Sequence, residues 1–192
     1  MGCGKSSVGR RLSELLCCSF MDLDDVIVEA AGRSIPEIFA SDGEAVFRRM
    51  ERDALELVFN MQETRQSALS PDLEWQNTDH ILQTDTQHDQ TDAERISAVL
   101  ALGGGTVMTP ECAEMVREHT LCVYLRASVD TLVSHLEGES SGRPILQGNL
   151  RQRIEDLMAR RSSTYENTAH VIIDTDGKSV SDIAKEISGL TL

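Results

Sequence analysis

The first residues of the chain form a motif that can bind phosphate. Residues 2–7 read GCGKSS, which matches the second half of the P-loop pattern GxxxxGK[ST]. Glycines let backbone N–H groups turn toward phosphate oxygens, a lysine reaches the terminal phosphates, and a hydroxyl holds Mg²⁺. The apolar spacing of residues 5–18 predicts a helix directly behind the motif, and the positive N-terminus of a helix favours bound anions. We interpret the motif as a P-loop rather than a chance N-terminal turn.

Two carboxylates follow the next predicted element. Residues 19–21 are short and apolar and predict a buried strand, after which the chain reads Asp22-Leu23-Asp24. Ligands of open α/β sheets bind beyond the carboxyl ends of strands. The pair therefore suits a Mg²⁺–nucleotide on one side and a substrate hydroxyl on the other. Acids at this point are equally typical of a helix N-terminus, so the pair alone leaves both interpretations open.

A long amphipathic helix is predicted over residues 43–60. Arg48, Arg49 and Glu51 lie on it, and charged residues on such a helix are typical of a solvated face. We expect its apolar side to comprise Val46, Phe47, Met50, Ala54, Leu57 and Val58.

The other elements alternate between helices and short apolar strands. Residues 98–102 predict a fully apolar strand that leads into Gly103-Gly104-Gly105. Such a triplet allows close approach to a ligand or tight helix packing. Further strands are predicted over 121–125 and 171–174, and further helices over 25–31, 35–40, from Thr109 onward, 129–136, 150–168 and 179–190. Short strands that are apolar on both sides are typical of a parallel sheet with helices on both faces. We therefore predict an α/β fold.

Two segments differ from this pattern. Residues 62–96 hold eight acidic and two basic residues and few apolar ones. Such a composition cannot bury enough surface to offset its ordering entropy, so we expect an acidic surface insertion that is disordered or loosely docked. Residues 137–149 are rich in glycine and serine, which predicts a mobile loop.

The overall composition excludes several classes of protein. The 192 residues suffice for one domain, 1–192. The net charge of −14 argues against nucleic-acid and membrane-surface partners, which are anionic, but not against a small anionic substrate. We find no run of 18 apolar residues and no signal peptide. Five cysteines without metal spacing indicate reduced thiols, so we expect a cytoplasmic protein.

Taken in order, the motifs resemble those of the shikimate kinases. The matching stretches are GCGKSS, FMDLDD, GRSIPEIFASDGEAVFRRME, LALGGGTV, SGRPIL and RRSSTY followed by VIIDTDGKS. The resemblance covers nearly all of the chain except 62–96. It implies ATP-dependent phosphorylation of shikimate at its 3-hydroxyl, in aromatic amino-acid biosynthesis. It also implies a monomer with the P-loop NTPase fold, a five-stranded parallel sheet, and Mg²⁺ bound with ATP.

The resemblance assigns roles to individual residues. For ATP it implies Gly2, Cys3, Gly4, Lys5, Ser6, Ser7 and the lid residue Arg143, with Ser6 and Asp22 supporting the metal. For catalysis it implies Lys5, Asp24 as candidate base, and Arg143; for shikimate it implies Asp24, Arg48, Gly104 and Arg161. A carboxylate such as shikimate is naturally bound by guanidinium groups. The lid would be residues 137–149, and residues 174–179 would lie near adenine.

Two alternatives remain open from the sequence. One is another small-molecule kinase of the same fold, such as a gluconate kinase. The other is an inactive nucleotide-binding remnant, because the first P-loop glycine and the strand before it would precede Met1. In the family that strand is central, and its loss would expose the edges of two neighbouring strands. We expect the reading frame to extend upstream through an apolar stretch, and the chain as written to be poorly soluble or inactive alone.

Overall fold

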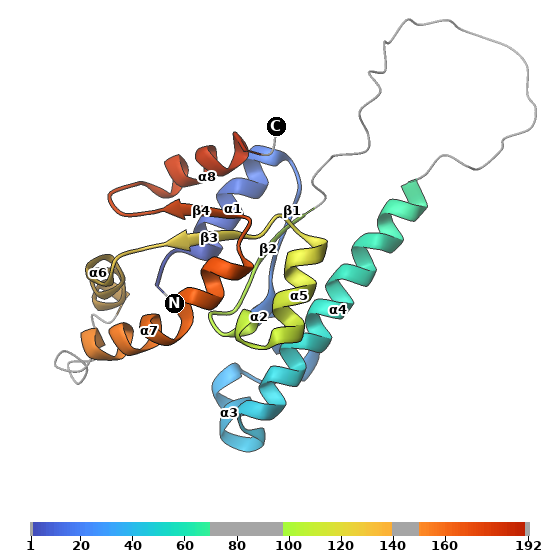
Figure 1. The fold of residues 1–192 in the computed structure, drawn as a ribbon. Helices are drawn as coiled ribbons and strands as arrows, with labels where there is room; N and C mark the ends of the chain where they lie inside the picture. Colours follow the sequence, from blue (N-terminus) through green and yellow to red (C-terminus); the bar gives the residue numbers. More distant parts are fainter. Residues whose placement is uncertain (1, 70–97, 140–149, 191–192) are drawn as a thin grey trace, which may run out of the picture.

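The computed structural model describes residues 2–69, 98–139 and 150–190. Figure 1 shows short strands alternating with helices along this part of the chain, which confirms the predicted α/β class. The elements are α1 (Lys5–Leu16), β1 (Ser19–Asp22), α2 (Leu23–Ala31), α3 (Ile35–Asp42), α4 (Glu44–Leu69), β2 (Ala98–Ala101), the 3-10 helix η2 (Thr106–Met108), α5 (Pro110–His119), β3 (Val123–Arg126), α6 (Val129–Glu139), α7 (Leu150–Thr168), β4 (Val171–Asp174) and α8 (Val180–Ser188).

The strands form two parallel pairs rather than one sheet. β1 pairs with β2, with Ser19 opposite Ala98, and β3 pairs with β4, with Val123 opposite Val171. In the described ranges β2 and β3 do not pair with each other. Each therefore has one edge that no strand among the described residues pairs with.

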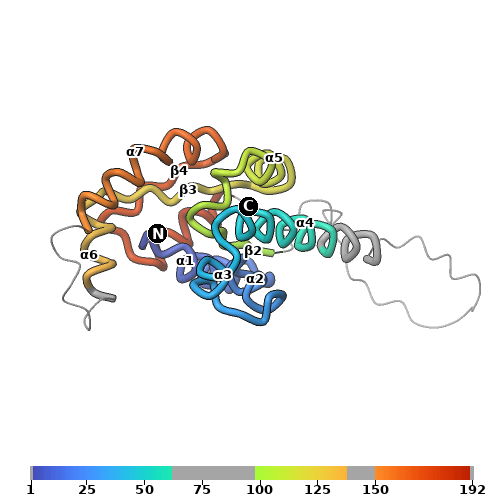
Figure 2. The backbone as a smooth tube through the Cα atoms, turned by 90° about the horizontal axis from the view of Figure 1, so that it is seen from below, coloured from blue at the N-terminus to red at the C-terminus, as the bar shows by residue number. Residues whose placement is uncertain are grey.

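Helices cover both faces of the strands, as predicted. On one face α1 and α8 pack against β3 and β4, through residues such as Val8, Leu125, Ile173 and Ile183. On the other face a second apolar cluster joins α2, α3, α4 and α5; its buried members are Leu23, Ile27, Ile38, Phe47, Ala54, Leu55, Val107, Cys112 and Val116. Figure 2 shows the strands lying between α5 and α7 on one side and α1 on the other. The strands that lead to the site are thus held between helices on both faces.

The strands are less buried than predicted. Ser19 in β1 is exposed and Ile172 in β4 is 39% exposed, while most other strand residues are half-buried. The prediction of buried strands over 19–21 and 121–125 was wrong to this extent. Ser19 and Ile172 lie on β1 and β4, each of which pairs with one strand among the described residues, and strand burial in a parallel sheet depends on neighbours on both sides.

Several boundaries also differ from the prediction. α4 continues to Leu69, so the first residues of the predicted insertion at 62–96 are helical, and 70–97 lie outside the described residues. α6 continues to Glu139, so the predicted loop at 137–149 begins as helix, and 140–149 are likewise outside. α7 and β4 match their predicted ranges.

One residue of the predicted apolar side of α4 is on the wrong face. Leu57 is 50% exposed, whereas Leu55 is buried. Phe47, Ala54 and Val58 are buried as predicted. Among the described helices, none has the length and apolar character needed to cross a bilayer.

Candidate active site

Two glycines of the predicted P-loop have a backbone conformation that glycine adopts more readily than other residues. Gly2 and Gly4 have φ values of 72° and 73°, a region that favours glycine because a β-carbon is strained there. Gly4 is the N-cap of α1, so Lys5 and Ser6 open the helix and its first N–H groups are directed at the loop. The carbonyl of Gly2 lies 2.8 Å from a ring nitrogen of His135 on α6. The loop is therefore held by α6 as well as by α1.

Ser6 and the two carboxylates form one connected group. The hydroxyl of Ser6 donates to Asp22 Oδ2 at 2.6 Å. Asp22 Oδ1 accepts the backbone N–H of Asp24 at 3.1 Å and so caps α2. The helix-cap interpretation is therefore confirmed for Asp22, which also lies beside the P-loop; its role toward a Mg²⁺–nucleotide stays a prediction.

The same group suits Mg²⁺ that arrives with a nucleotide. Hydroxyl and carboxylate oxygens are hard ligands, and Mg²⁺ is commonly held by one or two of them together with phosphates and water. Within the described ranges there is no cluster of three or more His, Cys, Asp or Glu that could hold a metal ion. The donor set therefore fits a metal shared with the substrate rather than a resident metal in a cage of protein ligands.

Asp24 lies in an environment that favours its protonated form. Burial raises the pKa of the Asp24 carboxyl, and the carboxylates of Asp22 and Glu51 raise it further, while the ammonium group of Lys5 opposes them. A raised pKa brings a carboxylate closer to the range in which it accepts a proton effectively near neutral pH. The raised pKa is compatible with the predicted role of Asp24 as a base, which stays a prediction.

Side chains of the site lie close to two glycines of the triplet, Gly103 and Gly105. A β-carbon at position 103 would lie 2.9 Å from Asp24 Oδ1 and 3.0 Å from both Glu51 Oε1 and Thr106 Oγ1. A β-carbon at position 105 would lie 2.7 Å from the Arg48 Nη2 atom. Of the two uses predicted for the triplet, the described structure shows close packing, in this case against the charged groups of the site.

Arg48 and Glu51 form a partly buried ion pair on α4. Arg48 Nη1 donates to Glu51 Oε2 at 2.6 Å, and Nη2 donates to Glu44 Oε1 at 2.8 Å. The Glu51 side chain is 1% exposed, and its other oxygen accepts the Thr106 hydroxyl at 2.6 Å. The guanidinium group of Arg48 is therefore oriented by these two carboxylates before any ligand binds.

Glu51 and Thr106 were missed as site residues by the sequence analysis. The prediction that Glu51 lies on a solvated face was wrong, because its carboxylate is buried against Thr106 and Arg48. One signal could have found it. Glu51 lies four residues after Phe47 and four before Leu55, both buried, so it occupies a position in the apolar stripe of α4.

Arg161 reaches the triplet from α7. Its Nη1 atom donates to the carbonyl of Gly104 at 2.9 Å. The hydroxyl of Tyr165, one turn later, donates to the same carbonyl, and its ring lies 5.2 Å from that of Tyr124. Arg161 and Tyr165, which belong to the matching stretch RRSSTY, thus donate hydrogen bonds to the same backbone carbonyl.

The structure brings most of the predicted site residues to one edge. Lys5, Arg48 and Arg161 provide positive charge there, in a chain whose net charge is −14. The other predicted site residues at this edge are Gly2, Gly4, Ser6, Asp22, Asp24 and Gly104. Arg143 lies outside the described residues. Asp174, the last residue of β4, accepts two hydrogen bonds from Arg126 of β3 at 2.6 and 2.9 Å.

Comparison with known proteins accounts for this arrangement. The family model described as shikimate kinase matches residues 1–70 and 82–190. The chain belongs to the shikimate kinase family. Residues 71–81, which the family model leaves unmatched, fall within the segment 62–96 that we predicted to be an insertion.

Relatives in this family are similar along most of their length. A shikimate kinase of Stenotrophomonas maltophilia is 33% identical over 95% of this chain and 82% of its own. One of Salinibacter ruber is 35% identical over 92% and 74%. A solved structure, shikimate kinase from Acinetobacter baumannii in complex with shikimate, has a TM-score of 0.73 and 29% identity and covers 99% of this chain and 87% of that one. The P-loop NTPase fold is thereby confirmed.

Proposed function

We propose that the chain transfers the γ-phosphoryl group of ATP to the 3-hydroxyl of shikimate. The observation that carries the proposal is the convergence of the P-loop, Asp24 and Arg48 on the glycine triplet, in a chain of the shikimate kinase family. A gluconate-kinase-like activity is not favoured, because the similar proteins are shikimate kinases. An inactive remnant is not favoured either, because Lys5, Arg48 and Arg161 are all present at the site. A monomeric state and a cytoplasmic location remain part of the proposal.

The phosphate end of the site uses the start of α1. In this proposal the N–H groups around Gly2 and Gly4 hold the phosphate oxygens, and the Lys5 ammonium group contacts the transferred phosphoryl group. Mg²⁺ would be held by the Ser6 hydroxyl and the Asp22 carboxylate, and when bound it neutralises charge on the phosphates. Arg143, outside the described residues, is proposed to add positive charge over the same phosphates.

The substrate end uses the two arginines. Arg48 and Arg161 are proposed to bind the shikimate carboxylate, since guanidinium groups match a carboxylate in charge and geometry. Arg48 is held from one side by buried Glu51 and from the other by Glu44, whose side chain is 67% exposed. An incoming carboxylate therefore displaces Glu44 more readily than Glu51. The pair with Glu51 keeps Arg48 oriented during this exchange.

Asp24 is the proposed base. It accepts the proton of the substrate hydroxyl as that oxygen forms a bond to the γ-phosphorus, while the bond from phosphorus to the β,γ-bridging oxygen breaks and ADP leaves. Its raised pKa makes the carboxylate a better proton acceptor than an ordinary aspartate. Arg48 and Arg161 are proposed to position shikimate, and Lys5 and Arg143 to neutralise charge on the transferred phosphoryl group.

A coupled assay of ADP release tests the proposal. The chain is incubated with ATP and Mg²⁺ together with shikimate, gluconate or no acceptor. We expect ADP release that depends on shikimate, and its loss in Asp24→Asn. Asp25→Asn is the matched control, because Asp25 is the next carboxylate on the same helix and is exposed. Equal rates with and without shikimate, or full activity in Asp24→Asn, would contradict the proposal.

A further inference from the structure

Two donors from α7 converge on one backbone oxygen of the glycine triplet. The Nη1 atom of Arg161 donates to the carbonyl of Gly104 at 2.9 Å, and the hydroxyl of Tyr165 donates to the same oxygen. Residues four apart lie on one face of a helix, and a carbonyl oxygen has two lone pairs. Both hydrogen bonds can therefore be present together, and the loss of one still leaves the carbonyl held by the other.

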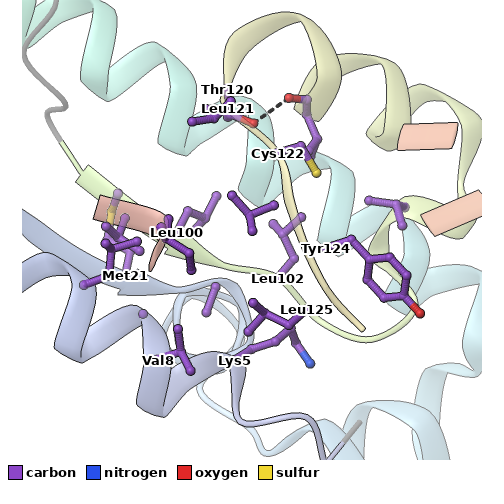
Figure 3. A pocket seen from close by; sticks show the side chains of 18 of the residues that line it. Lys5, Val8, Met21, Leu100, Leu102, Thr120, Leu121, Cys122, Tyr124 and Leu125 are labelled. Atoms are coloured by element: carbon purple, nitrogen blue, oxygen red, sulfur yellow. Dashed lines mark hydrogen bonds between the residues drawn. The ribbon is translucent and has the colours of Figure 1, made fainter. Parts of the chain in front are cut away.

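The two donors differ in how firmly they stay at this carbonyl. A guanidinium group binds a carboxylate through charge-assisted hydrogen bonds, which are about twice as strong as neutral ones. In the proposed function the shikimate carboxylate binds Arg161 and so draws this donor away from Gly104. The ring of Tyr165 is half-buried against the apolar cluster of α2, α3, α4 and α5. It also lies 5.2 Å from the ring of Tyr124, which Figure 3 shows projecting from β3. Tyr165 therefore stays in place when Arg161 turns to the substrate.

The peptide that contains this carbonyl lies between the two arginines proposed to bind the substrate carboxylate. Its oxygen, on Gly104, contacts Arg161. Its nitrogen belongs to Gly105, where a β-carbon would lie 2.7 Å from the Nη2 atom of Arg48. In a trans peptide the C=O and N–H groups point in opposite directions. Because the Gly104 carbonyl is directed at α7, the N–H of Gly105 is turned away from α7.

This peptide can rotate unless its carbonyl is held. Glycine adopts more backbone conformations than other residues, and the triplet has three glycines in succession. No backbone carbonyl among the described residues accepts the N–H of Gly104 or Gly105, so the donors on the Gly104 carbonyl are what fix the orientation. A rotated peptide would turn its carbonyl oxygen, which carries partial negative charge, toward the side where its N–H now lies, and would repel an incoming carboxylate.

We propose that Tyr165 is a positioning residue for substrate binding. Its hydroxyl holds the Gly104 carbonyl while Arg161 binds the carboxylate of shikimate, so the peptide between Gly104 and Gly105 keeps its orientation. The role rests on the proposed function, because shikimate is the carboxylate that competes for Arg161. Tyr165 itself contacts neither ATP nor shikimate in this proposal and acts through the backbone of the triplet.

The test compares Tyr165→Phe with Tyr124→Phe in the full chain. Each variant keeps its aromatic ring and loses one hydroxyl, and in the described structure the Tyr165 hydroxyl is the one that donates to Gly104. Titration calorimetry with shikimate gives the dissociation constant without turnover, and initial rates give the KM for shikimate and for ATP. We expect Tyr165→Phe to raise the dissociation constant and the KM for shikimate about fivefold or more, with the KM for ATP unchanged. Tyr124→Phe should leave all of these values as they are in the unaltered chain.

Several results would overturn the proposal. One is an equal dissociation constant for shikimate in the unaltered chain and in Tyr165→Phe. Another is equal weakening in both tyrosine variants, because the effect would then belong to ring packing. A parallel rise in the KM for ATP would also overturn it, since a general loss of structure affects both substrates.

The same measurements separate this role from the proposed function. If the unaltered chain does not bind shikimate at about 1 mM, a concentration that detects even weak complexes, both proposals are overturned. Binding without turnover would contradict the phosphoryl transfer alone, and the dissociation constants would still decide the role of Tyr165.

Discussion

Replacement of Glu51 should weaken the fold and shikimate binding together. Its buried carboxylate accepts hydrogen bonds from Thr106 and Arg48, each at 2.6 Å. Glu51→Ala leaves the fully buried Thr106 hydroxyl without a partner, at about 1–3 kcal/mol, and removes a charge-assisted hydrogen bond worth about 1.5–3 kcal/mol. Arg48 keeps Glu44 and is 22% exposed, which places the total near the lower end. We expect the free energy of unfolding to fall by about 3 kcal/mol.

Glu44→Ala is the matched control, because Glu44 pairs with the same arginine on the same helix. Its side chain is 67% exposed, so its loss should cost less than about 1 kcal/mol. Glu51→Gln separates charge from packing, since the amide can still accept from Thr106. Urea unfolding measures stability, and initial rates at saturating ATP give the KM for shikimate. The KM should rise about tenfold or more in Glu51→Ala, corresponding to about 1.4 kcal/mol, and change little in Glu44→Ala.

Two outcomes would refute this reasoning. If Glu51→Ala and Glu44→Ala lower the free energy of unfolding equally, the burial of Glu51 adds nothing to the stability of the fold. If Glu51→Ala is destabilised but keeps its KM for shikimate, Glu51 supports the fold without orienting Arg48. Circular dichroism confirms in each case that the variant is folded under assay conditions.

Three further predictions concern the same site. Arg48→Ala and Arg161→Ala should each weaken shikimate binding by about 2–5 kcal/mol while ATP binding is retained. The effect is measured as a higher KM for shikimate or as loss of turnover. Unchanged shikimate kinetics in both variants would exclude these arginines from substrate binding. Lys5→Ala should lower kcat by about 10²–10³-fold with little change in the KM for shikimate, and a variant altered only in KM would contradict the role of Lys5. Because burial, Asp22 and Glu51 raise the pKa of Asp24, activity should be lost on acidification at a higher pH than for an ordinary aspartate. Glu51→Gln should move this acid limb of the kcat/KM profile to lower pH, whereas an unmoved limb would mean that another group titrates.

The sequence predicted those features that depend on neighbouring residues. Residues 150–168 and 171–174 carry clear local patterns, and α7 and β4 occupy these ranges. Ser128 directly precedes the helix predicted over 129–136, and its hydroxyl accepts the N–H of Thr131 at 3.2 Å. The order of the motifs was also enough to identify the family.

Features that depend on distant partners could not be predicted. Glu51 is buried because Thr106, 55 residues later, supplies a hydroxyl to it, and no local pattern records that pairing. Strand exposure likewise depends on which strands are neighbours. The extension of α4 to Leu69 has a different cause: residues 62–69 read QETRQSAL, and most of these are good helix formers. Our prediction gave more weight to their polarity than to this propensity.

The open strand edges and the acidic excess act in opposite directions on encounters between copies of this chain. The edges of β2 and β3 that no described strand pairs with can pair with another molecule. A net charge of −14 keeps molecules apart through mutual repulsion. Salt weakens only the second effect, since the Debye length falls from about 30 Å at 0.01 M to about 10 Å at 0.1 M. Colloidal stability of the chain should therefore decrease as ionic strength rises. Dilute buffers of low salt are the conditions in which single molecules of this chain persist.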